Sequence, residues 1–127
     1  MAKSSHDRWI DYCQSGKFRG YDEDGKKLFL AGARRAANLI NKALDLGADV
    51  RVCRGGVAVS GEVDLHGDDI YLSLGLGCGP DLQVLIRRCN GRKNSTGGPN
   101  NWARWEDLRG LERGEARILD IIRALRR

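Results

Sequence analysis

The stretch NGRKNSTGGPNNW, from Asn90 to Trp102, combines residue types that bind phosphorylated ligands. Arg92 and Lys93 can neutralise phosphate, and Gly91, Gly97 and Gly98 let the backbone approach a ligand with its amides turned towards anionic oxygens. The amide and hydroxyl side chains between them can bond sugar hydroxyls or base edges. We therefore predict a ligand-binding surface loop. The alternative is a plain connector, because Gly and Asn are common in any turn.

The predicted site extends to both sides of this loop. Two arginines precede it, and Trp102 and Trp105 follow it, so an indole is available to stack on a base. Each Trp is also a good core residue, and we expect one of the two at the site. The predicted ligand-binding residues are Arg87, Arg88, Arg92, Lys93, Asn94, Ser95, Thr96, Gly97, Gly98, Asn100, Asn101, Trp102 and Trp105.

The cysteines do not have the spacing of a metal site. None of the four forms a CxxC or CxxH pair, so we expect reduced thiols, no bound metal and no cofactor. Two of them are expected in strands or at strand ends as small apolar residues. The four cysteines are Cys13, Cys53, Cys78 and Cys89.

Catalytic signals are weak. His66 stands among aspartates in DLHGDD, a composition that suits acid–base or metal chemistry but is better explained by a hairpin turn. The loop lacks the Walker order, and no nucleophile elbow or zincin motif is present. We expect a protein without enzymatic activity. A small hydrolase that uses His66 or a cysteine is the less favoured alternative.

Composition and charge indicate a globular protein and the chemistry of its partner. With 127 residues, 41% of them hydrophobic and 31% charged, the chain is expected to form one globular domain, 1–127. The N-terminal segment has no apolar signal region, so we expect a cytoplasmic protein without a membrane partner. Residues 1–86 hold 11 Lys or Arg against 12 Asp or Glu, and residues 87–127 hold 11 against 5. This asymmetry indicates an anionic partner, or else a solubilising surface.

The hydrophobic periodicity changes along the chain. A helical period runs over 27–46 and again over 111–125, with a short helix expected after Ser4 or Ser5. Between the long helices the period is two, which predicts four strands at 50–54, 57–65, 69–76 and 81–89 joined by short turns. We predict an α+β fold with a four-stranded antiparallel meander. Leu85 and Tyr71 fall on the sheet face opposite the helices, which favours a homo-oligomer.

A resemblance narrows the expected ligand. The sequence CNGRKNSTGGPNNW after a predicted meander, with the earlier helix FLAGARRAANLINKAL, resembles small proteins of tailed phages. Over 27–125 the chain resembles the phage sponges that disarm Thoeris immunity by sequestering a cyclic ADP-ribose signal without cleaving it. The resemblance implies a phage-encoded binder of a small cyclic nucleotide in the host cytoplasm. The alternative is a basic protein that binds nucleic acid or, like anti-CRISPR proteins, inhibits a nucleic-acid-guided defence complex.

Overall fold

The computed structural model describes residues 4–15, 23–55, 61–75, 83–94 and 96–127. The elements are α1 (Ser5–Gln14), α2 (Glu23–Leu44), β1 (Asp49–Cys53), β2 (Glu62–His66), β3 (Ile70–Leu74), β4 (Val84–Arg88), β5 (Asn101–Ala103), the 3-10 helices η1 (Trp105–Leu108) and η2 (Leu111–Arg113), and α3 (Arg117–Leu125). The five strands form one antiparallel sheet in chain order. The predicted α+β class is confirmed.

The sheet differs from the prediction by one strand. The four predicted strands are present within a few residues of their expected bounds, and β5 is added at the end of the Gly- and Asn-rich loop. β5 has only three residues, too few to show a period of two, and it pairs with β4 through Leu85 and Trp102. The expected strand positions Val57, Val59 and Leu82 lie outside the described residues.

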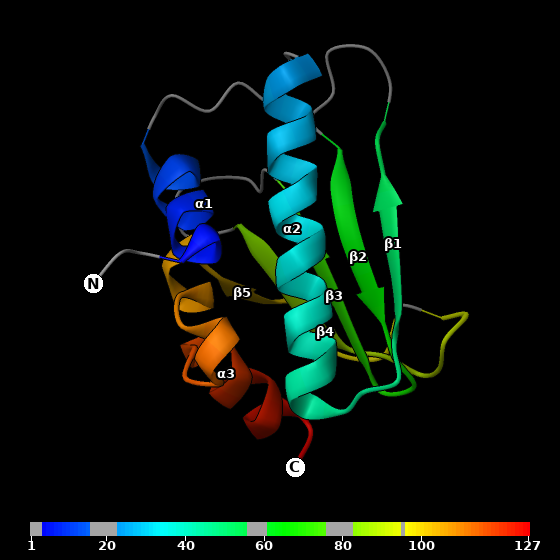
Figure 1. The fold of residues 1–127 in the computed structure, drawn as a ribbon. Coiled ribbons are helices and arrows are strands. Elements are labelled where there is room, and N and C mark those ends of the chain that lie inside the picture. Colours follow the sequence, from blue (N-terminus) through cyan, green and yellow to red (C-terminus); the bar gives the residue numbers. More distant parts are fainter. Residues whose placement is uncertain (1–3, 16–22, 56–60, 76–82, 95) are drawn as a thin grey trace.

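All the helices lie on one face of the sheet (Figure 1). α2 packs on β1 and β2, while α1, η1 and α3 gather beside it, with α3 against β4. The inward residues of β2, β3 and β4 are buried, as the alternation predicts. In β1, at the edge of the sheet, Val50 is only partly buried and Val52 is 37% exposed. Fully buried strand residues are Val63, Leu65, Ile70, Leu72, Leu74, Val84 and Ile86.

An aromatic cluster joins α1 to α2 and η1. The Trp105 ring makes edge contacts with Trp9 and Phe29 at centroid distances of 5.6 and 5.5 Å. Gly32 makes room for the Trp9 ring, because a Cβ at position 32 would lie 2.2 Å from atoms of that ring. The short N-terminal helix is thereby fixed to the centre of the core, and Ser4 caps it by accepting from the Asp7 N–H.

The C-terminal helix is shorter than predicted. α3 begins at Arg117 rather than at residue 111, and η2 precedes it. Gly110 and Gly114 have φ of +87° and +71°, in the left-handed region, which interrupts a helix. The apolar spacing from Leu111 nevertheless serves the core, because Leu111 is buried in η2. In the described part of the chain, no helix has both the length and the apolar character needed to cross a bilayer.

Candidate functional site on the open face of the sheet

The sheet face opposite the helices carries a set of polar and aromatic side chains. No described helix or strand covers it, and its residues are partly exposed, in contrast to the buried positions that alternate with them. We call this surface the outer face. Its members are Asp49, Arg51, Cys53, Glu62, Asp64, His66, Tyr71, Ser73, Leu85, Arg87 and Trp102.

One row of the outer face crosses all five strands. In this row Arg51 pairs with Asp64, Asp64 with Ser73, Ser73 with Leu85 and Leu85 with Trp102. Neighbouring side chains in such a row stand about 5 Å apart, so they form one continuous surface. A cation therefore lies at one end of the row and an indole at the other.

A carboxyl pair occupies the middle of the outer face. Ser73 Oγ donates to Glu62 Oε2 at 2.6 Å, while Asp64 Oδ1 is buried without a donor. Burial, with the hydrogen bond to Glu62, raises the pKa of Asp64 from its ordinary 3.8 to about 7. Hydrogen bonds from Asp64 and Ser73 lower the pKa of Glu62. The pair thus holds one proton, on Asp64, at pH values below about 7.

Two hollows lie on either side of this pair. The first, of about 220 Å³, has an apolar side formed by Leu85 and Trp102 and a polar side formed by Glu62, Ser73 and Gln83. Gln83 Oε1 accepts the Trp105 backbone N–H, which leaves the Gln83 amide NH₂ to donate. An aromatic wall with hydrogen-bonding groups beside it suits a planar heterocycle.

The second hollow, also of about 220 Å³, is mainly polar. It is lined by Asp49, Arg51, Asp64, His66, Tyr71 and Arg92. Arg51 has no ion pair among the described residues, so its guanidinium is available to an anion. His66 Nε2 lies 2.7 Å from the Gly91 carbonyl oxygen, which positions the ring and occupies that nitrogen. This contact fixes the His66 ring to the loop.

Arg92 is a clamp between the loop and the sheet. Its Nε donates to Asp68 Oδ1 at 2.8 Å, its Nη1 lies 3.4 Å from Asp49 Oδ2, and its Nη2 donates to the Gly47 carbonyl. The positive charge that we predicted for a ligand is thus paired with two carboxylates of the protein itself. Arg92 therefore holds the loop against the sheet, and its side chain also lines the second hollow.

The loop amides mostly bond within the loop. Asn94 Oδ1 accepts from the Thr96 N–H and hydroxyl, and Asn101 Nδ2 donates to the Pro99 carbonyl. Asn100 Oδ1 accepts from Arg87 Nε at 2.9 Å, which brings the loop onto the outer face. Lys93, Gly97 and Gly98 lie in the loop away from the two hollows, and Ser95 is outside the described residues.

The flanking residues of the predicted site are divided between different surfaces. Trp102 lies on the outer face with 36% of its surface exposed, whereas Trp105 is 3% exposed in the core. Arg87 lies over the Tyr71 ring at 5.8 Å on the outer face, and Arg88, the next residue along β4, points to the other side. Of the predicted set, the structure brings together Arg87, Asn100 and Trp102.

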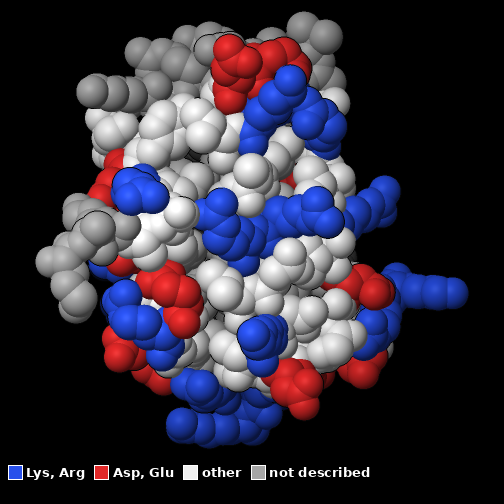
Figure 2. All heavy atoms as spheres, in the orientation of Figure 1, with Lys and Arg blue, Asp and Glu red and all other residues white. Residues whose placement is uncertain are grey.

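Part of the excess positive charge of residues 87–127 is paired with acids from residues 1–86. Cations of the C-terminal part pair with acids from the rest of the chain: Arg109 with Asp11 at 2.7 Å, and Arg126 with Asp69 at 2.9 Å. Figure 2 shows another basic surface, a band of Lys and Arg across the α2 side. Along its length, α2 exposes Lys27, Arg34, Arg35 and Lys42.

Cysteines and potential metal ligands lie elsewhere. Cys13, Cys53 and Cys89 are reduced, with Cys53 at the end of β1 and Cys89 buried directly after β4, as expected; Cys78 is outside the described residues. Within the described ranges, one His and carboxylate group, formed by His6, Asp7 and Glu112, is close enough to share a metal ion. Sequence spacing does not indicate it, because Glu112 is distant along the chain.

The chain was compared with protein-family models, curated proteins and solved structures, and no match was found.

Proposed function

We propose that this protein binds a small phosphorylated nucleotide on the outer face of its sheet and does not transform it. The base would lie in the first hollow against Trp102, and phosphate would meet Arg51 in the second. Arg87 and Asn100, which bond each other beside Tyr71, would contact the sugar or a further phosphate. Binding without turnover would make the protein a sponge for a nucleotide signal, the role that the resemblance to phage proteins implies.

The observation that carries the proposal is the pairing of two hollows with different chemistry on a face that no described element covers. Stacking a base on an aromatic ring contributes about 1–3 kcal/mol. A charge-assisted contact between Arg and phosphate contributes a similar amount. The raised pKa of Asp64 reduces repulsion, because a protonated carboxyl beside Arg51 adds no negative charge to the phosphate hollow.

The dimensions favour a ligand longer than one nucleoside. Arg51 in β1 and Trp102 in β5 are four strand spacings apart, which is about 19 Å between backbones at ~4.8 Å per spacing. The arginine side chain shortens this gap but does not close it. A nucleotide with two phosphates, or one with two nucleosides, can reach from the indole to the guanidinium.

Single-stranded nucleic acid is the second candidate. The open sheet presents Tyr71 and Trp102 with Arg51 and Arg87 between and beside them, and open sheets with aromatic and basic side chains bind single strands. Salt dependence separates the two ligands. A strand that covers several cations releases counterions, so its affinity falls steeply with salt, whereas one nucleotide shows a shallower dependence.

Calorimetry with cyclic and linear ribonucleotides, including cyclic ADP-ribose, tests the proposal. Arg51→Ala and Trp102→Ala should each weaken binding roughly tenfold to a hundredfold while the melting temperature changes little. The matched control is Arg34→Ala, an exposed cation on the α2 side, which should bind like the parent. Failure of every nucleotide to bind contradicts the proposal, as does equal weakening by Arg34→Ala. Chromatography of the ligand afterwards should return it unchanged; conversion would instead indicate catalysis by the carboxyl pair.

A homo-oligomer is part of the proposal. Leu85 and Trp102 leave apolar surface on the outer face, and a second copy facing them would enclose the first hollow. Light scattering after size-exclusion chromatography should give a mass of at least two chains. A monomer at all concentrations would leave each nucleotide site to a single chain and contradict this part.

A further inference from the structure

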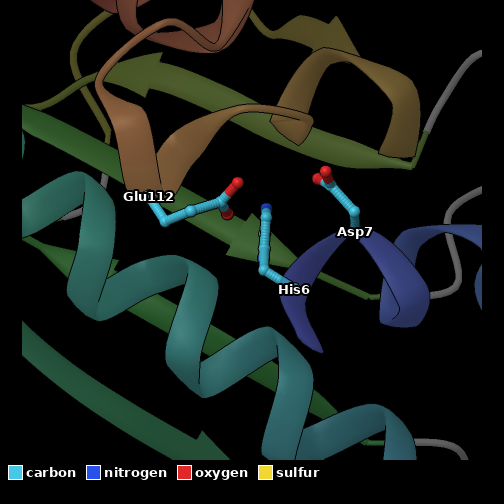
Figure 3. Close-up of side chains that lie close together, drawn as sticks. All are labelled: His6, Asp7 and Glu112. Atoms are coloured by element: carbon cyan, nitrogen blue, oxygen red, sulfur yellow. The ribbon is translucent and has the colours of Figure 1, made fainter. Parts of the chain in front are cut away.

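A second polar cluster lies where the start of α1 meets η2, on the helix side of the sheet. Figure 3 shows His6 and Asp7, from α1, pointing towards Glu112 of η2. A ring nitrogen of His6 and one carboxylate oxygen from each acid lie within 4.8 Å of one another. Residues from the two ends of the chain therefore converge on one point.

Two buried acceptors in this cluster have no donor. His6 is 2% exposed, and its Nε2 lies 2.8 Å from the Leu108 carbonyl oxygen. Because a carbonyl only accepts, Nε2 carries the proton of the neutral ring and Nδ1 its lone pair, and Nδ1 has no partner. Asp7 is 8% exposed and its Oδ1 also has no partner. Unpaired buried acceptors are costly, and a cation satisfies acceptors of both kinds.

We propose that His6, Asp7 and Glu112 bind a divalent transition-metal ion of the Zn²⁺, Co²⁺ or Mn²⁺ class. One imidazole and two carboxylates are a donor set for such ions, and three protein ligands leave a coordination position for water or a small ligand. The contact from His6 to the Leu108 carbonyl is the outer contact that metal-binding histidines usually make, and it fixes the tautomer. The ion joins α1 to η2 and enters from the side of Glu112, the more exposed ligand.

Arg113 is the competitor of the ion. Its Nη1 lies 3.0 Å from Glu112 Oε1 and 3.9 Å from Asp7 Oδ2, and its Nε lies 3.1 Å from Glu115 Oε2. The Arg113 side chain is 52% exposed, so it can turn outward to solvent. Metal binding and this guanidinium are thus alternatives, and removal of the arginine should strengthen the binding of the metal.

Titration calorimetry on the full chain, first stripped with a chelator, tests the site with Zn²⁺, Co²⁺ and Mn²⁺ separately. We expect one equivalent to bind, with Glu112→Gln weakening affinity at least tenfold and Arg113→Gln strengthening it severalfold. The matched control is Glu115→Gln, which removes a neighbouring carboxylate outside the cluster and should keep parental affinity. At a concentration of metal one hundred times Kd, the melting temperature should rise by roughly 5–10 °C.

Three results overturn the proposal. The first is the absence of stoichiometric binding by all three ions, which would mean that water serves the buried acceptors. The second is unchanged affinity in Glu112→Gln, a variant at a partly exposed position that should fold. The third is a thiolate charge-transfer band in the Co²⁺ complex, because it would place the metal on a cysteine. His6→Gln, checked for folding by circular dichroism, should lose binding if it folds.

Discussion

The shared proton of the carboxyl pair predicts an unusual dependence of stability on pH. Asp64 has its pKa raised from 3.8 to about 7 in the folded protein by burial and by Glu62. Folding therefore takes up a proton between these two values. The stability from this group is fully present below about pH 4, is lost as pH rises towards 7, and stays constant above that.

Asp64→Asn removes the ionisation and should recover this loss. Converted in full to free energy of unfolding, this change in pKa corresponds to about 4 kcal/mol. The side chain is half exposed, so solvent screening reduces the figure, and we expect about 1–2 kcal/mol. The advantage of the variant over the parent should thus grow between pH 4 and pH 7.5 and then level off. For a domain of this size that corresponds to roughly 3–8 °C in melting temperature.

Urea unfolding of parent and variant at half-unit steps from pH 4 to pH 9 measures the effect. Asp120→Asn, at an exposed site on α3 that pairs with Arg123, is the control and should give a difference that does not vary in this way. A constant difference in stability between Asp64→Asn and the parent across the whole pH range is the contradicting result. It would mean that Asp64 is ionised in the folded protein like any surface carboxylate.

Three further predictions concern the core, the loop and a thiol. Gly32→Ala should cost about 1–3 kcal/mol, because its methyl group would lie 2.2 Å from the Trp9 ring; a melting temperature within 1 °C of the parent would contradict this packing. Arg92→Ala should change the melting temperature little yet speed amide hydrogen exchange in the described loop residues 90–94 and 96–101, and unchanged exchange would show that the clamp is not needed. Burial raises the pKa of Cys13 to about 12, so iodoacetamide at pH 8 should label it far more slowly in the folded than in the unfolded protein, as read by peptide mass spectrometry.

The elements of the fold could be predicted because their periodicity is a local property. α2 and the strands from β1 to β4 have enough residues to display periods of 3.6 and 2. β5 has three residues, and its place depends on a partner strand rather than on its own pattern. The predicted start of α3 was wrong because the apolar spacing of a helix begins near Leu111. Gly110 and Gly114 have a left-handed backbone conformation there, which a helix does not allow.

The candidate site was less predictable, because it depends on which groups satisfy each other. In the sequence, Arg92 has the features of a ligand-binding cation. In the structure, it contacts the Gly47 carbonyl and the carboxylates of Asp49 and Asp68, which are distant along the chain. Glu62 and Asp64, which do not stand out in the sequence, form the carboxyl pair because they lie two residues apart on one face of β2, where β3 places Ser73 beside them. The alternation of the strands places Glu62, Asp64 and Ser73 on one face of the sheet. This alternation was the one feature of the sequence from which their proximity could have been predicted.

The most direct test of nucleotide binding on the outer face is a titration followed by two-dimensional amide NMR. With a ribonucleotide that binds, we expect chemical-shift changes at Arg51, Asp64, Ser73, Leu85 and Trp102, including the indole N–H of Trp102, and little change along α2. Lower pH should tighten the complex as Asp64 takes up its proton. Shifts confined to the α2 side, or to the loop at 90–94 and 96–98 without the sheet, would show that the nucleotide does not bind on the outer face.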